Sequence, residues 1–276
     1  QTVLQVNLKG IEVIQETATE VVVKAMAGEN WHQFVLFCID NDFGGIENLS
    51  LIPGNVGTAP IQNIGAYGVE IKDTFESCTA LDIQTLELKT FSREDCKFGY
   101  RDSIFKNEVK GRYIITSVSF KLTKETHRLN TSYGSIDSFL EEKGIETPGI
   151  KDVSDAVISI RKSKLPDPKI LGNSGSFFKN PVISKAKLTQ LQKDFPEIPF
   201  YILDDGQVKI PAGWLIDRAG LKGYREGDAG VHKNQALVLV NYGKASGEEI
   251  LSLSAKIQER IMNMFNIMIT PEVNIF

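Results

Sequence analysis

Cysteine and histidine are scarce in this chain, and neither is clustered. The residues concerned are Cys38, Cys78, Cys96, His32, His127 and His232. An odd number of widely spaced cysteines does not make a disulfide framework and fits a reducing, cytoplasmic location. No histidine has a cysteine or carboxylate at ligand spacing, so we expect no metal site.

Long apolar runs and an excess of one charge are also missing. No stretch is typical of a transmembrane segment or a signal peptide. A net charge of -4, from 31 basic and 35 acidic residues, gives no general attraction to nucleic acid or to an anionic membrane. The 276 residues are 42% hydrophobic and 24% charged, which is typical of a soluble globular protein with one to three domains.

The first third of the chain is expected to contain strands and one helix. Residues 3–14 and 21–25 are rich in β-forming types, whereas apolar residues at 31, 34, 35 and 38 follow helical spacing. Residues 81–91 and 114–122 are each predicted to form a strand. In the second of these, we expect Ile114, Thr116, Val118, Phe120 and Leu122 to share one face.

A helix and a domain boundary are predicted next. Ser154 is the expected N-cap of a helix that carries Val157 and Ile160. This helix should end near Lys164, because prolines follow at 166 and 168, and we place the boundary at that proline pair.

The last third has a mixed pattern. Leu188, Leu191 and Phe195 predict a helix, residues 236–240 a buried strand, and residues 253–265 a long amphipathic helix. Residues 270–276 are expected to form a short β-like end. Helices and strands do not alternate regularly, so the predicted class is α+β.

The stretch LGNSGSFFKNP, residues 171–181, is compatible with several kinds of site. A phosphate-binding loop would need a terminal Lys-Ser or Lys-Thr pair, and a nucleophile elbow would need glycine where Ser176 stands. A hydroxyl on a tight turn beside an apolar wall of Phe177 and Phe178 remains, which suits a proton donor in a dry pocket. An ordinary turn is the alternative.

Three further segments are unusual. Residues 50–73 interleave glycines with Gln62 and Asn63, and this suggests a cofactor loop in which the amide pair contacts a heterocycle or ribose. In FGYRDSIFK, Arg101 is either a surface ion pair or a guanidinium oriented toward a substrate carboxylate. In TPEV, burial beside Pro271 would keep Glu272 protonated.

Together these segments resemble the UDP-N-acetylenolpyruvoylglucosamine reductase family, also called MurB. The motifs IPGNVGTAPIQNIGAYG, YRDSIFK, KLPDP with GNSGSFFKNP, and AGWLID with GLKG stand in the family's order along nearly the whole chain. TSYGSI, around Tyr133, resembles the subgroup that closes a tyrosine-bearing loop over the substrate. The resemblance implies an FAD-binding domain of the vanillyl-alcohol-oxidase type, followed by a smaller α+β substrate domain.

The resemblance also implies an activity. NADPH would deliver a hydride through N5 of FAD to the enolpyruvyl group of UDP-N-acetylglucosamine enolpyruvate, giving UDP-N-acetylmuramate. Such an oxidoreductase would be a cytoplasmic, monomeric flavoprotein of peptidoglycan synthesis, and thereby of cell wall biogenesis, cell shape, the cell cycle and cell division. Another FAD-dependent oxidase, or a nucleotide-sugar binding module without chemistry, are the alternatives.

Site residues are implied by their places in the motifs. Arg101 would bind the substrate carboxylate, Glu272 would polarise it further, and Ser176 would donate the proton. The FAD positions would be Ile52, Pro53, Gly54, Gln62, Asn63, Gly65, Ala66, Gly68 and Arg161. The substrate positions would be Tyr133, Lys164, Asn180, Tyr201, Lys209, Lys222 and Gln235.

One family feature is not in this sequence. Family members begin with a small flavin lobe that carries a G-x-G-S-N turn, whereas this chain starts at TVLQVNLKGIEV. We therefore expect a remnant of that lobe at 1–9, an FAD-binding domain at 10–165, and a substrate-binding domain with a C-terminal catalytic segment at 166–276. Weak retention of FAD would follow.

Overall fold

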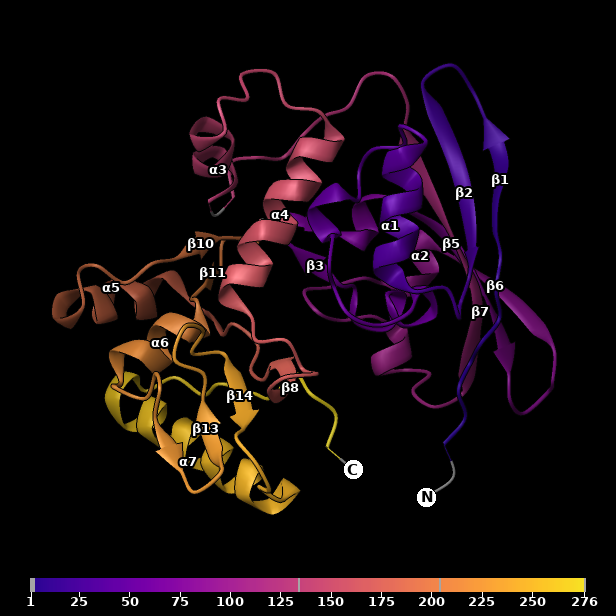
Figure 1. Cartoon of the computed structure of the whole chain (residues 1–276). Coiled ribbons are helices and arrows are strands. Elements are labelled where there is room, and N and C mark those ends of the chain that lie inside the picture. Colours follow the sequence, from indigo (N-terminus) through magenta and orange to yellow (C-terminus); the bar gives the residue numbers. More distant parts are fainter. Residues whose placement is uncertain (1–2, 134, 204, 276) are drawn as a thin grey trace. The chain divides into compact units, whose positions relative to one another are not determined.

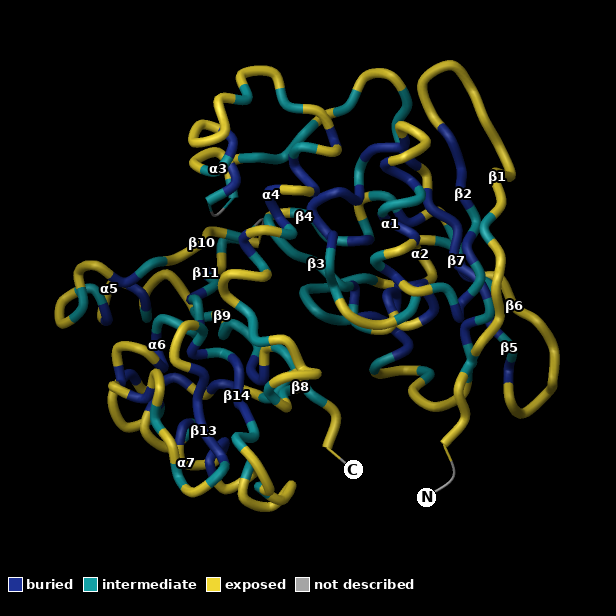
Figure 2. The backbone as a smooth tube through the Cα atoms, viewed as in Figure 1, coloured by how far each residue is buried: buried dark blue, intermediate teal, exposed yellow. Residues whose placement is uncertain are grey.

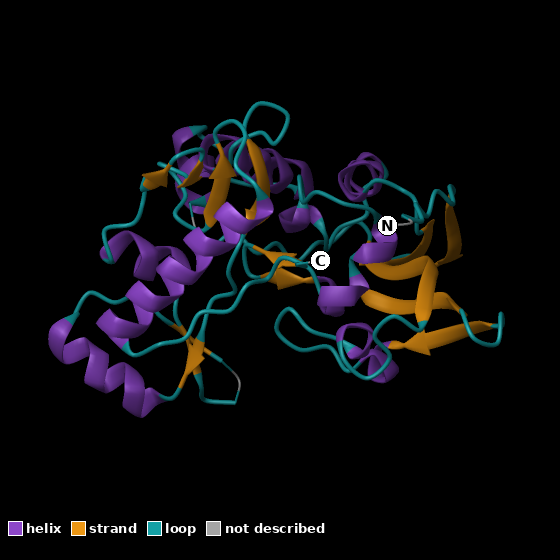
Figure 3. Cartoon of the chain, turned by 90° about the horizontal axis from the view of Figure 1, so that it is seen from below, coloured by secondary structure: helices purple, strands orange, loops and turns teal. Residues whose placement is uncertain are grey.

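A computed structural model describes residues 3–133, 135–203 and 205–275 (Figure 1). The chain divides into two compact units, Gln1–Arg161 and Lys162–Phe276. Each unit contains both helices and antiparallel sheet (Figure 3), which confirms the predicted α+β class. None of the helices in the described ranges is long and apolar enough to cross a membrane.

The first unit is built on a five-stranded antiparallel sheet with the order β1-β2-β7-β5-β6. The strands are β1 (Ile11–Glu16), β2 (Glu20–Met26), β5 (Phe75–Asp82), β6 (Leu88–Ser92) and β7 (Tyr113–Thr123). The central strands β2 and β7 are the most buried, as their dark blue colour in Figure 2 shows. Their burial follows from rows of valine, isoleucine and phenylalanine that suit a packed sheet face.

Helices and shorter strands connect and cover the strands of the first unit. They are α1 (Trp31–Asp40), η1 (Glu47–Leu49), η2 (Val56–Thr58), η3 (Pro60–Gln62), β3 (Gly65–Ala66), β4 (Val69–Glu70), η4 (Ile71–Asp73), α2 (Arg93–Cys96), η5 (Ile104–Lys106), α3 (Ile136–Glu142) and α4 (Ile150–Lys164).

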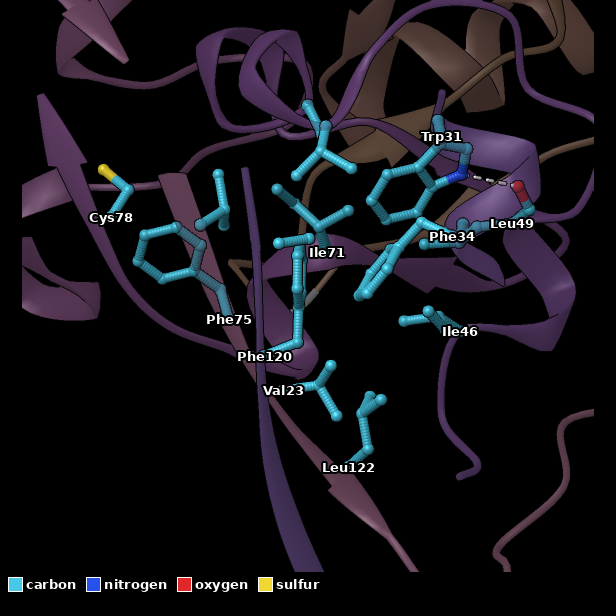
Figure 4. Close-up of a cluster of buried hydrophobic side chains, with 14 of the residues drawn as sticks. Val23, Trp31, Phe34, Ile46, Leu49, Ile71, Phe75, Cys78, Phe120 and Leu122 are labelled. Atoms are coloured by element: carbon cyan, nitrogen blue, oxygen red, sulfur yellow. Dashed lines mark hydrogen bonds between the residues drawn. The ribbon is translucent and has the colours of Figure 1, made fainter. Parts of the chain in front are cut away.

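Helix α1 forms where the sequence predicts it and packs on the sheet. The Asn30 side chain caps its start by accepting from the Gln33 N–H at 3.1 Å. The Phe34 ring lies 5.2 Å from that of Phe120 in β7, and the Trp31 indole donates to the Leu49 carbonyl at 2.9 Å (Figure 4). Burial of each such ring stabilises the unit by roughly 1.5–3 kcal/mol.

Two predicted strands of this unit have different bounds in the structure. Strand β1 begins only at Ile11, because the preceding residues have little to pack against: Val3 is 87% and Leu4 is 74% exposed. Residues 81–91 are not one strand. They contain a turn in which the Asp82 carboxylate accepts from the Gln84 N–H at 2.9 Å and Leu86 has a φ of 61°.

The predicted face of β7 and the predicted start of α4 are also wrong in part. The β5–β7 register shifts between Thr79 and Ala80, so Ile115 joins Val118, Phe120 and Leu122 in the core, while Ile114 and Thr116 are only half-buried. Helix α4 already begins at Ile150, although it ends at Lys164 as expected. Ser154 therefore lies inside the helix, where its hydroxyl is 2.8 Å from that of Ser50.

The described part of the second unit contains two small antiparallel sheets and three helices. One sheet has the order β12-β13-β14-β8 and the other the order β10-β11-β9. The elements are β8 (Gly172–Ser176), β9 (Val182–Ile183), α5 (Lys185–Asp194), β10 (Tyr201–Ile202), β11 (Val208–Lys209), α6 (Ala212–Arg218), β12 (Arg225–Glu226), β13 (Ala229–Val231), β14 (Val238–Asn241) and α7 (Gly247–Phe265).

The predicted elements of this unit are found with small shifts. Helix α7 buries Leu253, Ile257, Ile261 and Phe265, and a capping box between Ser246 and Glu249 fixes its start. Phe195 is the C-cap of α5, and the strand expected at 236–240 begins only at Val238. The expected β-like end makes one bridge, between Pro271 and Phe178, and residue 276 of that prediction lies outside the described ranges.

Candidate active site

The residues predicted to be catalytic are divided between the two units. Arg101 belongs to the first unit, whereas Ser176 and Glu272 belong to the second. All predicted FAD positions lie in the first unit, and the predicted substrate positions, apart from Tyr133, lie in the second.

The predicted cofactor loop, residues 52–68, is one irregular segment. It passes through η2 and η3 and ends in the short β3–β4 ribbon, where Gly65 pairs with Glu70 and Ala66 with Val69. Pro53, Gly54 and Gly68 are exposed. The loop therefore exposes part of its backbone to solvent, while buried side chains hold its other parts in place.

Asn63 fixes the middle of this loop. It is fully buried and has a left-handed φ of 43°. Its amide nitrogen donates to the Gly99 carbonyl at 2.9 Å and to the Glu70 carboxylate at 3.1 Å, while its oxygen accepts from the Lys72 N–H at 3.1 Å. In contrast to the predicted contact with a heterocycle, the side chain holds the loop to its neighbours.

Arg101 is held by the same loop. Its guanidinium donates to the Asn63 carbonyl at 3.4 Å and to the Gly65 carbonyl, and it lies 3.6 Å from the Glu70 carboxylate. A Cβ on Gly65 would lie 2.8 Å from the Val69 carbonyl oxygen, a backbone atom, and 2.8 Å from the Arg101 Nη1, so glycine is needed where the ribbon and the guanidinium approach. The side chain is 18% exposed, so Arg101 forms a partly buried ion pair with Glu70, and the two carbonyls give its guanidinium a fixed orientation.

The FGYRDSIFK segment is interlocked with the loop at two further points. The Ser103 hydroxyl donates to the Ile61 carbonyl at 2.7 Å, and the Lys106 ammonium donates to the Arg101 carbonyl at 3.3 Å. Two motifs about 40 residues apart in sequence thus form one piece of structure.

Arg161, at the end of the first unit, has an incomplete set of partners. Its Nε is buried and has no hydrogen-bond partner among the described residues. Burial lowers the pKa of Arg161, while the neighbouring Tyr67 opposes this shift. The Tyr67 ring in turn lies 6.5 Å from the Tyr133 ring, edge to face. A predicted FAD position and a predicted substrate position therefore both adjoin Tyr67 of the cofactor loop.

Ser176 ends a strand rather than a tight turn, which corrects the sequence interpretation. In the β8–β14 pairing, Ser176 is opposite Val238 and Asn173 is opposite Val240, so β8 holds one extra residue. Gly175 sits in this bulge with a φ of 74°, and its N–H donates to the Asn173 side chain at 2.9 Å. Bulges redirect a side chain, and here the Ser176 side chain is exposed on its unit.

The C-terminal tail brings the backbone of Glu272 to Phe177, the residue that follows Ser176. The Glu272 N–H donates to the Phe177 carbonyl at 2.8 Å, and the Lys179 N–H donates to the Thr270 carbonyl at 2.9 Å. Glu272 is half-buried rather than buried as expected. Phe177 and Phe178 are 5% and 1% exposed and belong to the core, so they anchor the segment rather than form an exposed wall.

Two of the predicted substrate residues are neighbours in the second unit. Tyr201 and Lys209 are directly paired across β10 and β11, and the Lys209 ammonium lies 5.5 Å from the Tyr201 ring centroid. This pair gives one aromatic surface with a positive charge beside it.

The other predicted substrate residues of this unit do not contact one another in the hydrogen bonds and ion pairs of the described residues. The Asn180 side chain accepts from the Ala212 N–H at 2.9 Å and so fixes the start of α6. The Lys222 ammonium lies 2.8 Å from the Asp217 carboxylate. Gln235 accepts from the Leu237 N–H at 3.4 Å, and Lys164 is exposed at the end of α4.

One buried residue near this site is absent from the sequence-predicted set. Asn48 is 1% exposed and donates to the Tyr67 carbonyl at 3.0 Å. The sequence does contain a signal that could have identified Asn48. Glu47 and Asn48 form a polar pair between Ile46 and Leu49, shortly before the IPGN motif, and polar side chains in an apolar setting need hydrogen-bond partners.

The comparisons with known proteins first give a class. Residues 1–87 match the FAD binding domain family, so the first unit is of the flavin-binding kind. Residues 167–276 match the C-terminal domain of UDP-N-acetylenolpyruvoylglucosamine reductase.

Similar proteins then give the family. A Flavobacterium johnsoniae UDP-N-acetylenolpyruvoylglucosamine reductase is 61% identical over 273 residues, which cover 99% of this chain and 81% of the relative. The Pseudomonas syringae pv. syringae protein of the same name is 53% identical over 274 residues, covering 99% and 80%. The crystal structure of the Thermus caldophilus reductase (MurB) matches with a TM-score of 0.61 and 25% identity, covering 91% of this chain and 71% of that one. The chain belongs to the UDP-N-acetylenolpyruvoylglucosamine reductase family.

Proposed function

We propose that the protein is an NADPH-dependent flavoenzyme that reduces UDP-N-acetylglucosamine enolpyruvate to UDP-N-acetylmuramate, a peptidoglycan precursor. Its membership of the reductase family supports the activity and the use of FAD and NADPH. The observation that carries the proposal is the Arg101 guanidinium, held within the cofactor loop by two backbone carbonyls.

The first unit fits FAD in two respects. Arg161 has a buried Nε that lacks a partner among the described residues, and a polar atom of a bound flavin could accept from it. Tyr67 of the loop at residues 52–68 adjoins Arg161, and Pro53, Gly54 and Gly68 of the same loop are exposed. We assign residues 52–68, with Arg161, to FAD binding. When bound, FAD supplies the redox chemistry by taking a hydride from NADPH and passing it to the enolpyruvyl group.

The chain's own residues would stabilise charge and move a proton. Reduction of a double bond beside a carboxylate places negative charge on that carboxylate and needs a proton at the adjacent carbon. We assign the carboxylate to Arg101, because a planar guanidinium binds it through two parallel hydrogen bonds. Glu272 would polarise the carboxylate further, and Ser176, which the bulge at Gly175 leaves exposed, would give the proton.

The second unit supplies the groups for the nucleotide sugar. Lys164, Lys209 and Lys222 provide positive charge, which a diphosphate needs. Tyr201, Asn180 and Gln235 would provide the other contacts, and Tyr133 would reach the substrate from its loop. Apart from Tyr133 and Lys164, these groups lie in residues 166–276, to which we assign substrate binding, and we assign FAD binding to residues 10–165.

The setting of the enzyme is also proposed. All three cysteines are buried and free, which fits the reducing cytoplasm. We propose that the enzyme acts in the cytoplasm as a monomer. Light scattering, which gives the mass of the protein in solution, tests this proposal.

A visible absorption spectrum is the experiment that tests the function. The purified chain is incubated with FAD and desalted, then treated with NADPH and finally with the enolpyruvyl sugar. A flavin spectrum that bleaches and then recovers supports the reductase. Turnover with a small alcohol as reductant and oxygen as oxidant, but none with the enolpyruvyl sugar, would indicate an oxidase. Tight UDP-sugar binding without any flavin would indicate a binding module.

A further inference from the structure

A buried turn joins four parts of the first unit. It consists of η1 and the residue after it, which are Glu47, Asn48, Leu49 and Ser50, each no more than 3% exposed. The Leu49 carbonyl accepts from the Trp31 indole of α1, and the Ser50 hydroxyl bonds to Ser154 of α4. Asn48 supplies the remaining two connections.

The Asn48 amide nitrogen bridges two loops. It donates to the Tyr67 carbonyl at 3.0 Å and to the Asn130 carbonyl at 2.7 Å. Carbonyl oxygens only accept, so the nitrogen end of the amide must face them, and each of its two hydrogens has a partner. Tyr67 belongs to the cofactor loop, and Asn130 lies three residues before Tyr133.

A second contact strengthens the same junction. The Asn130 side chain donates to the Gly68 carbonyl at 3.3 Å, and the rings of Tyr67 and Tyr133 stand edge to face at 6.5 Å. Two side-chain amides therefore hold the chain before Tyr133 to the end of the cofactor loop: the buried amide of Asn48 and the outer amide of Asn130.

We propose that Asn48 is a positioning residue for the reaction, which sets the place of Tyr133 relative to the flavin-binding loop. The inference rests on the proposed function, in which Tyr133 contacts the substrate and residues 52–68 hold FAD. Asn48 itself touches neither ligand. It acts through the carbonyls of Tyr67 and Asn130, and its loss affects the substrate half of the reaction through Tyr133.

The test uses the FAD-loaded chain and the variant Asn48→Asp, which keeps the shape but replaces both donor hydrogens by acceptor oxygen. We expect KM for the enolpyruvyl sugar to rise about tenfold, since the substitution leaves buried carbonyls unpaired. In the FAD-loaded chain, bleaching of the flavin by saturating NADPH should change less than about twofold, because Asn48 contacts the loop through the Tyr67 carbonyl and does not itself touch FAD. In a Tyr133→Ala background, Asn48→Asp should raise KM by no more than about twofold, because the effects of coupled residues do not add.

Two further variants keep the test decisive. Asn41→Asp makes the same chemical change at an exposed amide that donates to the Phe37 carbonyl at 2.8 Å, and it should leave KM unchanged. Asn130→Ala removes the outer contact to Gly68, together with a 3.5 Å contact from the Ser132 hydroxyl, but keeps the carbonyl that Asn48 binds. It should raise KM about threefold even if the Asn48 variant does not fold.

The outcomes separate this inference from the proposed function. Full additivity of Asn48→Asp with Tyr133→Ala, or an equal effect of Asn41→Asp, overturns the positioning role. Absence of turnover in the unaltered FAD-loaded chain counts instead against the proposed function. Hydrogen exchange of residues 124–133 then still tests the junction, because Asn48→Asp should speed exchange there and unchanged exchange would refute it.

Discussion

Replacement of Arg101 by lysine isolates what the planar guanidinium contributes. In the structure its nitrogens face the carbonyls of Asn63 and Gly65 and the Glu70 carboxylate. Lysine keeps the positive charge but has one compact ammonium, so it cannot satisfy the loop carbonyls and also bind a substrate carboxylate through two parallel bonds.

The expected loss follows from the missing hydrogen bonds. A hydrogen bond to a charged group contributes about 1.5–3 kcal/mol, and each 1.4 kcal/mol of barrier changes a rate tenfold. Loss of one of the two bonds to the carboxylate should therefore slow the reaction with substrate by roughly ten- to a hundredfold. Reduction by NADPH involves no such carboxylate and should keep its rate.

Stopped-flow absorbance of the flavin measures the two half-reactions separately. Arg112→Lys is the matched control, because the Arg112 guanidinium also binds a carboxylate through two nitrogens, at 2.8 and 2.9 Å from Asp82. It should lose some stability and show normal kinetics in both half-reactions. Near-normal reoxidation of the Arg101→Lys enzyme by substrate would refute the reasoning and leave Arg101 with a structural role only.

Three other predictions concern Ser176, the bulge beside it and acid stability. Ser176→Ala should still let NADPH bleach the flavin but slow its reoxidation by the enolpyruvyl sugar by roughly 10²–10⁴-fold in stopped flow, and an unimpaired second step would remove Ser176 from the role of proton donor. Gly175→Ala should lower the free energy of unfolding in urea by about 1–2 kcal/mol, because φ is 74° there, and open space around the added Cβ adds no steric cost. Gly144→Ala, with a φ of 70° and equally open space, should lower it by the same amount. A larger loss at Gly175 would mean that steric contacts matter. Hydrogen bonding to Arg112 lowers the pKa of Asp82, so this pair stabilises the fold above the ordinary carboxyl pKa, and the stabilisation is lost as pH falls through the lowered value. The Arg112→Gln variant should therefore have a lower melting temperature than wild type at neutral pH, and the difference should disappear in acid. A difference in melting temperature that does not depend on pH would contradict this.

The sequence was sufficient for the elements with strong periodicity. Apolar spacing predicted helix α1 and the apolar part of helix α7, whereas the start of α7 at Gly247, which Ser246 caps, was not predicted. The strand register could not be predicted from the sequence. A one-residue irregularity between Thr79 and Ala80 moves Ile115 into the core, and an alternating pattern of apolar residues does not reveal it.

The same limit explains the error at Ser176. A Gly-Asn-Ser-Gly-Ser run has the composition of a turn, but β14 offers it a partner strand that is about 60 residues away in sequence. The pairing turns the run into a strand, and the glycine then serves as the bulge. Local composition identified the unusual backbone correctly, whereas its structural form depended on a distant segment.

The carbonyls of the cofactor loop connect the two residues for which we propose new tests. The carbonyls of Asn63 and Gly65 accept from Arg101, and the Tyr67 carbonyl accepts from Asn48. Alternate residues of this stretch thus turn their oxygens toward donors inside the protein. A change at either donor should therefore loosen the loop as well as alter its own contact, and weaker FAD retention by both variants would follow. The YRDSIFK segment and the turn at Glu47–Leu49 are, on this argument, parts of the cofactor loop's support, although neither needs to touch FAD.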